Sequence, residues 1–138
     1  MKKVMCFGTF DILHEGHRFY LTEARKLGDY LVVVVARDET VKEVKKQQPL
    51  NAENVRVRNL QKLGIADKVV LGNSGDKLKV VEDEKPGIVC LGYDQTFFTD
   101  NIKEKLRQRG LDIEVVRLPA CKPEVYKSSL IRKRAMSA

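Results

Sequence analysis

The two histidines of the chain stand three residues apart, in a loop rich in groups that suit phosphate. His14 and His17 lie in the stretch GTFDILHEGH, and Gly16 stands between them where the next helix is expected to begin. The start of a helix presents free N–H groups and the positive end of the helix dipole, and a glycine lets the backbone approach an anion closely. With two imidazole donors beside it, the loop suits a polyphosphate and the charge that develops on it during reaction.

A second group of residues suited to phosphate lies near the C-terminus, in the stretch KSSLIRK at 127–133. Ser128 and Ser129 can donate hydrogen bonds to a phosphate while they cap a helix that runs through about Arg134. Arg132 follows about one turn along that helix, where it can add positive charge. An ordinary helix cap before a basic tail would give the same pattern, but its pairing with the histidine loop favours phosphate binding.

The two stretches resemble the signature motifs of the nucleotidyltransferase superfamily. GTFDILHEGH resembles the form GTFD-x-x-H-x-GH of its cytidylyltransferase-like branch, and KSSLIRK is similar to the serine-rich motif that precedes the last helix there. The order and spacing of the motifs agree with the branch over 4–133. A zinc site is a competing interpretation of the histidines, but HxxH with Glu15 does not match the HExxH pattern, and further ligands would be needed.

The resemblance implies a role for each residue that matches the branch. His14 and His17 would stabilise charge on the α- and β-phosphates of a nucleoside triphosphate. Lys45, favoured over Lys46 by its spacing, would reach across to these phosphates as a third catalytic group. Asp11 would lie near the phosphate of a phosphorylated acceptor or near the metal, and Arg56 would bind the acceptor phosphate or make a subunit contact. Mg²⁺ would enter on the triphosphate, and no tightly bound organic cofactor is expected. The nucleotide would be bound by Thr9, Phe10, Gly16, Asp94, Ser128, Ser129 and Arg132.

Two groups within the branch compete. The stretches GDYLVVVVARDETVKEVK, LGYDQTF and KSSLIRK look more like the archaeal-type FAD synthases, which transfer AMP from ATP to FMN and release pyrophosphate. The glycerol-3-phosphate cytidylyltransferases usually carry an arginine near the cytosine, before the last helix, and the corresponding stretch 118–127 contains none. We therefore expect an FMN adenylyltransferase. A CTP-dependent cytidylyltransferase acting on glycerol 3-phosphate or a similar small phosphate ester is the alternative.

The strands that must position these residues are indicated by five short apolar runs. They are expected at 4–7, 31–36, 68–71, 88–91 and 113–116. The run LVVVVA at 31–36 is too apolar to have a wet face, so we expect a central strand buried on both sides. The last run is the weakest and is expected at an edge of the sheet.

Segments with helical periodicity separate these strands. Helices are expected near 19–27, 38–44, 57–63, 78–84, 102–109 and 128–134, with Gly28 at the C′ position of the first and Asp38 capping the second. Strands that alternate with helices predict right-handed βαβ units. The sequence therefore predicts an α/β fold, a Rossmann-like, doubly wound parallel sheet of five strands, in a single domain over 1–138. Ligands of such sheets bind beyond the carboxyl ends of the strands.

The composition indicates which classes of binding partner and which cellular compartment to expect. The 138 residues carry a net charge of +7 and contain no apolar run near the roughly 20 residues of a membrane span. Three widely spaced cysteines, Cys6, Cys90 and Cys121, form no disulfide framework, so a reducing, cytoplasmic setting is expected. We expect small-molecule substrates and neither nucleic acid nor membrane as partners. The resemblance further implies a homodimer.

Two readings from other classes compete with an enzyme. A basic nucleic-acid-binding module would account for the charge, but aromatic residues make up only 7% of the chain and no known binding motif is present. A flavodoxin-like domain would share the alternating pattern of strands and helices. Neither gives a role to the paired histidines or to KSSLIRK.

Overall fold

The architecture is a five-stranded, all-parallel sheet. In the computed structural model, which describes residues 2–45, 48–73, 75–92 and 102–118, the strands follow the order β3-β2-β1-β4-β5. All five predicted strands are confirmed to within one residue, and the last lies at an edge as expected. The strands are β1 (Lys3–Gly8), β2 (Tyr30–Val35), β3 (Lys68–Leu71), β4 (Ile88–Leu91) and β5 (Glu114–Arg117).

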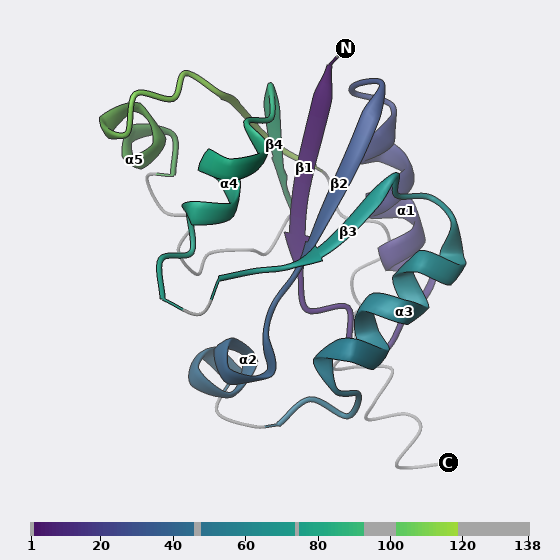
Figure 1. Cartoon of the computed structure of the whole chain (residues 1–138). Helices are drawn as coiled ribbons and strands as arrows, with labels where there is room; N and C mark the ends of the chain where they lie inside the picture. Colours follow the sequence, from purple (N-terminus) through teal and green to yellow (C-terminus); the bar gives the residue numbers. More distant parts are fainter. Residues whose placement is uncertain (1, 46–47, 74, 93–101, 119–138) are drawn as a thin grey trace.

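Helices cover both faces of this sheet, as predicted for a doubly wound fold. Those described are α1 (Glu15–Arg25), α2 (Asp38–Lys45), α3 (Glu53–Leu63), α4 (Lys79–Glu84) and α5 (Ile102–Gln108). Figure 1 shows α1 and α3 on one face, α4 and α5 on the other, and α2 beyond the end of β1. The helix expected at 128–134 lies outside the described residues. Within the described ranges, no helix is long and apolar enough to cross a membrane.

The strands bury side chains alternately toward the two faces, as their period of two requires. Val33 and Val35 of β2 pack with Leu21 of α1 and Leu60 of α3. Val32 and Val34 face α4 and α5 on the other side of the sheet. The residues of β2 from Leu31 to Val35 are at most 3% exposed, which confirms a strand buried on both sides. Burying each such valine contributes roughly 1.5–3 kcal/mol before the cost in conformational entropy.

The order of the strands reverses between β1 and β4. The chain adds β2 and β3 on one side of β1 and then returns to add β4 and β5 on the other side. At this point the Tyr20 hydroxyl of α1 lies 3.3 Å from the Phe7 carbonyl oxygen and 3.1 Å from that of Cys90, to which it donates. Tyr20 therefore ties β1 to β4 at the carboxyl ends, the place where open α/β sheets bind their ligands.

The predicted end of the first helix is wrong. α1 ends at Arg25, with Lys26 as its C-cap, so Gly28 is not the C′ residue. A Cβ atom at Gly28 would lie 2.6 Å from the Lys2 carbonyl oxygen. Gly28 is therefore required by the close approach of this turn to the start of β1, and not by a left-handed helix end. That conformation occurs at Gly64 after α3, where φ is 77°.

Candidate functional site

His14 is the N-cap of α1. Its Nδ1 atom accepts a hydrogen bond of 3.0 Å from the Gly16 N–H, and its carbonyl oxygen accepts the Arg18 N–H at 3.1 Å. Because Nδ1 is an acceptor, the neutral imidazole carries its proton on Nε2. Burial lowers the pKa of His14, opposed in part by the Glu15 charge, so this neutral form is favoured near pH 7. The Gly16 amide, expected at the nucleotide, is bonded to His14.

His17 lies one turn along α1 and faces His14. The centroids of the two imidazole rings are 4.0 Å apart, with 32° between their planes. The Phe10 ring packs beside them, 5.3 Å from the His17 ring and 6.4 Å from the ring of Tyr20. The structure therefore brings the two predicted catalytic histidines together at the start of α1, just beyond the carboxyl end of β1.

Phe10 has an uncommon backbone conformation. Its φ is 54°, in the left-handed region, and its ring is 2% exposed. A Cβ atom at Gly8 would lie 2.6 Å from the Phe10 ring, so the glycine leaves room for the ring to fold back against β1. The Phe10 side chain is part of the core and does not face solvent. Non-glycine residues in this conformation cost about 1–3 kcal/mol and cluster at functional sites.

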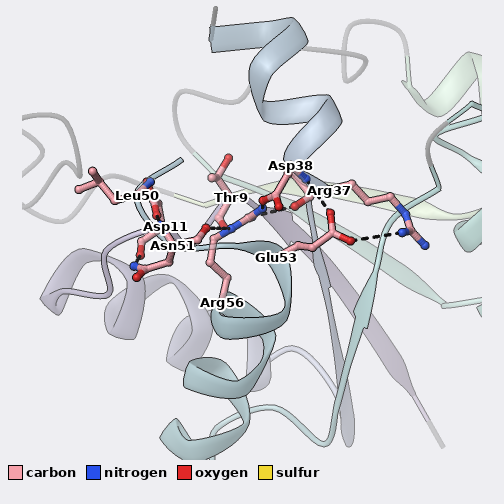
Figure 2. Close-up of polar contacts among 9 residues, drawn as sticks. Thr9, Asp11, Arg37, Asp38, Leu50, Asn51, Glu53 and Arg56 are labelled. Atoms are coloured by element: carbon pink, nitrogen blue, oxygen red, sulfur yellow. Dashed lines mark hydrogen bonds and ion pairs between the residues drawn. The ribbon is translucent and has the colours of Figure 1, made fainter. Parts of the chain in front are cut away.

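The Arg56 guanidinium is completely buried at the carboxyl ends of β1 and β2. Nη1 donates to the carbonyl oxygens of Thr9 (2.8 Å) and Ala36 (2.7 Å), and Nε donates to that of Asn51 (3.0 Å). Nη2 donates to an Asp38 carboxylate oxygen at 2.6 Å. Figure 2 shows Arg56 between Thr9 and Asp38. Arg56, predicted to contact the acceptor, instead makes four bonds to the protein itself.

Asp38 does not cap α2, contrary to the prediction. It is the first residue of the helix, and the Val41 N–H donates to the carbonyl oxygen of Arg37, which is the capping position. The Asp38 carboxylate accepts a hydrogen bond from Arg56, and the Asp38 backbone N–H donates to a carboxylate oxygen of Glu53 at 2.8 Å. α2 is therefore attached to the start of α3 by Asp38.

Asp11 is also engaged within the protein. It is 5% exposed, and its two carboxylate oxygens accept the N–H groups of Leu50 and Asn51, both at 2.8 Å. The Asn51 side-chain amide donates back to the Asp11 carbonyl oxygen at 2.5 Å. Asp11, the other predicted acceptor residue, thus fixes the segment between α2 and α3 against the histidine loop (Figure 2).

For the other predicted site residues, the structure gives only a position in the chain or no description. Thr9 follows β1 directly and leads into the loop, and Lys45 is the last residue of α2. In the described ranges, no three His, Cys, Asp or Glu side chains come together to hold a metal ion. Four residues predicted at the nucleotide lie outside the described residues: Asp94, Ser128, Ser129 and Arg132.

Sequence analysis missed two residues that shape the site. Asn51 lies just before α3, but its partner Asp11 is 40 residues away, so no local signal reveals the pairing. Tyr20 lies in the helix predicted near 19–27, and the apolar residues of that helix predict only a face packed on the core. A single hydroxyl on that face was a usable signal, because a buried hydroxyl must find an acceptor.

Curated relatives match the chain over most of its length. The family model for cytidylyltransferase-like proteins matches residues 5–134. The FAD synthase of Aciduliprofundum boonei is 51% identical over 118 residues, which is 86% of this chain and 78% of that protein. The FAD synthase of Thermoplasma volcanium is 43% identical over 136 residues, which is 99% of this chain and 95% of that protein.

Solved structures confirm the fold. A Thermoplasma volcanium crystal structure described as a lipopolysaccharide core biosynthesis protein has a TM-score of 0.84 at 43% identity, covering 88% of this chain and 99% of that one. The pantoate-β-alanine ligase of Francisella tularensis has a TM-score of 0.64 at 14% identity over 88% of this chain and 60% of that one, a likeness of fold alone. With the paired histidines at the start of α1 and relatives along its whole length, the chain belongs to the cytidylyltransferase-like family of nucleotidyltransferases and, within it, to the FAD synthases.

Proposed function

We propose that this enzyme transfers the AMP group of ATP to FMN and forms FAD and pyrophosphate. The observation that carries the proposal is the pair of neighbouring imidazoles, with ring centroids 4.0 Å apart, at the N-terminus of α1. This arrangement suits the binding of a triphosphate. The similarity to FAD synthases over up to 99% of the chain supports ATP and FMN as the two substrates.

In the proposed reaction, a phosphate oxygen of FMN attacks the α-phosphorus of ATP. A new P–O bond forms, the bond from the α-phosphorus to the bridging oxygen breaks, and pyrophosphate leaves with that electron pair. Such transfers depend on positioning and charge stabilisation more than on covalent catalysis. The Nε2–H of neutral His14 and the imidazole of His17 would donate to phosphate oxygens as charge shifts toward the pyrophosphate.

Other residues complete the proposed nucleotide site. Lys45 and Arg132 would neutralise the triphosphate, and Thr9 and Ser129 would donate hydrogen bonds to it. Gly16, Asp94, Ser128 and the backbone of Phe10 are the remaining proposed contacts. Mg²⁺, when bound, would offset the charge of the phosphates; phosphate oxygens and water are the ligands it prefers.

The test is a comparison of two substrate pairs in the presence of Mg²⁺. Pyrophosphate release is measured with ATP plus FMN and with CTP plus glycerol 3-phosphate, and FAD is identified by chromatography with fluorescence detection. We expect release and FAD formation with the first pair only. Release with the second pair only would make the enzyme a cytidylyltransferase, and silence with both would overturn the proposed reaction.

We also propose that the enzyme is a cytoplasmic homodimer acting on small molecules, as its resemblance to the family implies. Two large apolar side chains are exposed close together in the sequence, and both suit a subunit contact. They are Leu50 (63%), which precedes α3, and Val55 (37%) in its first turn. Light scattering after gel filtration should give twice the chain mass of 15.7 kDa. A mass equal to that of one chain would contradict the dimer.

A further inference from the structure

We propose that Arg56 is a positioning residue for the nucleotidyl transfer, and not a ligand of the acceptor. Its fully buried guanidinium joins three segments around the histidine loop: Thr9 after β1, Ala36 and Asp38 between β2 and α2, and Asn51 before α3. The catalytic consequence rests on the proposed function, whereas the effect on the loop can be measured without it.

The four acceptors of Arg56 come from three separate parts of the chain. Thr9 begins the histidine loop and Asn51 precedes α3. Ala36 and Asp38 both belong to the connection from β2 to α2. One planar group therefore sets the distance between the loop after β1 and the helix that carries Lys45. Arginine suits this position because its guanidinium presents five N–H donors in a fixed plane, whereas a lysine ammonium is a compact point charge with three.

Asn51 connects Arg56 to Asp11, the residue that follows Phe10 in the chain. Its carbonyl oxygen accepts from Arg56, and its backbone and side-chain N–H groups donate to Asp11. The segment from Thr9 to Asp11 is thus held at both ends, with Phe10 at a φ of 54° between them. A strained residue persists only where its surroundings over-determine its conformation. Arg56 and Asn51 supply that constraint, and the segment leads directly to His14.

The contacts also argue against the role first expected for Arg56. To reach an acceptor phosphate, the guanidinium would have to leave three carbonyl oxygens and a carboxylate, and each of these acceptors would lose its donor. Its burial is complete. The geometry therefore assigns the charge of Arg56 to the protein, where it holds the loop.

The experiment compares Arg56→Lys with two controls. Arg58→Lys makes the same replacement at an exposed position of α3, and Val81→Ala destabilises the core on the opposite face of the sheet, away from the loop. Melting temperature, kcat, and KM for ATP and for FMN are measured for each. Because misplacement by about 1 Å can cost about 100-fold in rate, we expect Arg56→Lys to lower kcat at least ~10-fold with both KM values within ~3-fold. Both controls should keep kcat.

A second readout needs no activity. The chain has two histidines, His14 at the end of the loop and His17 in the first turn of α1. The imidazole C2–H signals in a proton NMR spectrum therefore report on the junction of the loop and α1. We expect Arg56→Lys to shift both signals, while Arg58→Lys and Val81→Ala leave them in place. If Arg56→Lys does not fold, Asp38→Ala serves instead, because it removes the carboxylate that accepts from Arg56 at 2.6 Å.

Two results would overturn the proposal. Unchanged histidine signals in the folded variant would show that Arg56 does not position the loop. A raised KM for FMN at unchanged kcat would return Arg56 to the acceptor. If the wild-type enzyme forms no FAD, the proposed function fails, but the NMR comparison still decides whether Arg56 holds the loop.

Discussion

At the scale of single residues, the hydrogen bond from Gly16 to His14 fixes how His14 works. Its Nδ1 must remain unprotonated to accept the Gly16 N–H, so the imidazole acts as a neutral group that donates from Nε2. Protonation would turn that acceptor into a second donor and break the helix cap. The neutral form that we propose for catalysis and the form that caps the helix are thus the same form of His14.

This coupling predicts the acidic limit of the enzyme. Burial lowers the pKa of His14, so the neutral imidazole is favoured in the folded state. The stabilisation from this group is present above the usual histidine pKa of about 6.5 and is lost as the pH falls through the lower folded value. We expect kcat/KM to stay constant down to about pH 6.5 and to fall at lower pH. NMR titration of the two imidazoles checks the assignment, and a His14 midpoint above 6.5 would contradict it.

Replacing His17 by alanine should separate catalysis from stability. Loss of one donor to charge developing in a transition state costs roughly 100- to 1,000-fold in kcat. The His17 side chain is only partly buried, so we expect the melting temperature to change by a few degrees at most. Steady-state kinetics and thermal unfolding of His17→Ala measure both quantities. Turnover at the wild-type rate would remove His17 from the mechanism.

The residue scale also shows what sequence can and cannot predict. His14 and His17 were found because the signal is local, two imidazoles and a glycine within one turn. The hydrogen-bonding role of Arg56 could not be predicted, because its acceptors Thr9 and Ala36 are 47 and 20 residues away in sequence. A charged side chain is normally expected at the surface. Only the folded arrangement shows that its donors are used inside the protein.

At the scale of elements, strands were easier to predict than helix ends. The apolar runs predicted β1, β2 and β4 most clearly, because parallel strands buried on both faces read as continuous hydrophobic stretches. The start of α1 at Glu15 agrees with the start expected at Gly16, but α3 begins four residues earlier than its apolar period, at Glu53. Gly28 was assigned to a helix end because sequence does not reveal how close another segment passes.

Gly28→Ala tests that close approach. The added Cβ would lie 2.6 Å from the Lys2 carbonyl oxygen, a backbone atom that cannot move without disturbing the start of β1. We expect a loss of about 1–3 kcal/mol in the free energy of unfolding, the usual cost of overpacking. Gly75→Ala is the matched control, because a Cβ there meets nothing within 4 Å. Urea unfolding compares the two, and equal stability would show that the turn at Gly28 has room.

At the scale of the whole molecule, the boundary between β1 and β4 is the seam where the strand order reverses. It is also the place where two thiols and a phenol are buried in their neutral forms. Cys6 and Cys90 are partners in register across this seam, and both thiols are free and buried. The Tyr20 hydroxyl lies against them from α1. Burial raises the pKa of Cys6, that of Cys90 to about 12, and that of Tyr20 well above its usual value.

These buried acids predict a loss of stability in alkali. A thiol with a raised folded pKa keeps its proton in the native state, while the unfolded thiol ionises above about pH 9, so the unfolded state is favoured as the pH rises. Stability from this source is intact below pH ~9, and each thiol removes about 1.4 kcal/mol per pH unit above it. Urea unfolding between pH 7 and 10 should show a flat region and then a decline, and Cys90→Ala should decline less steeply. Equal slopes in the two proteins, or a flat curve to pH 10, would show that the seam is not sealed from water.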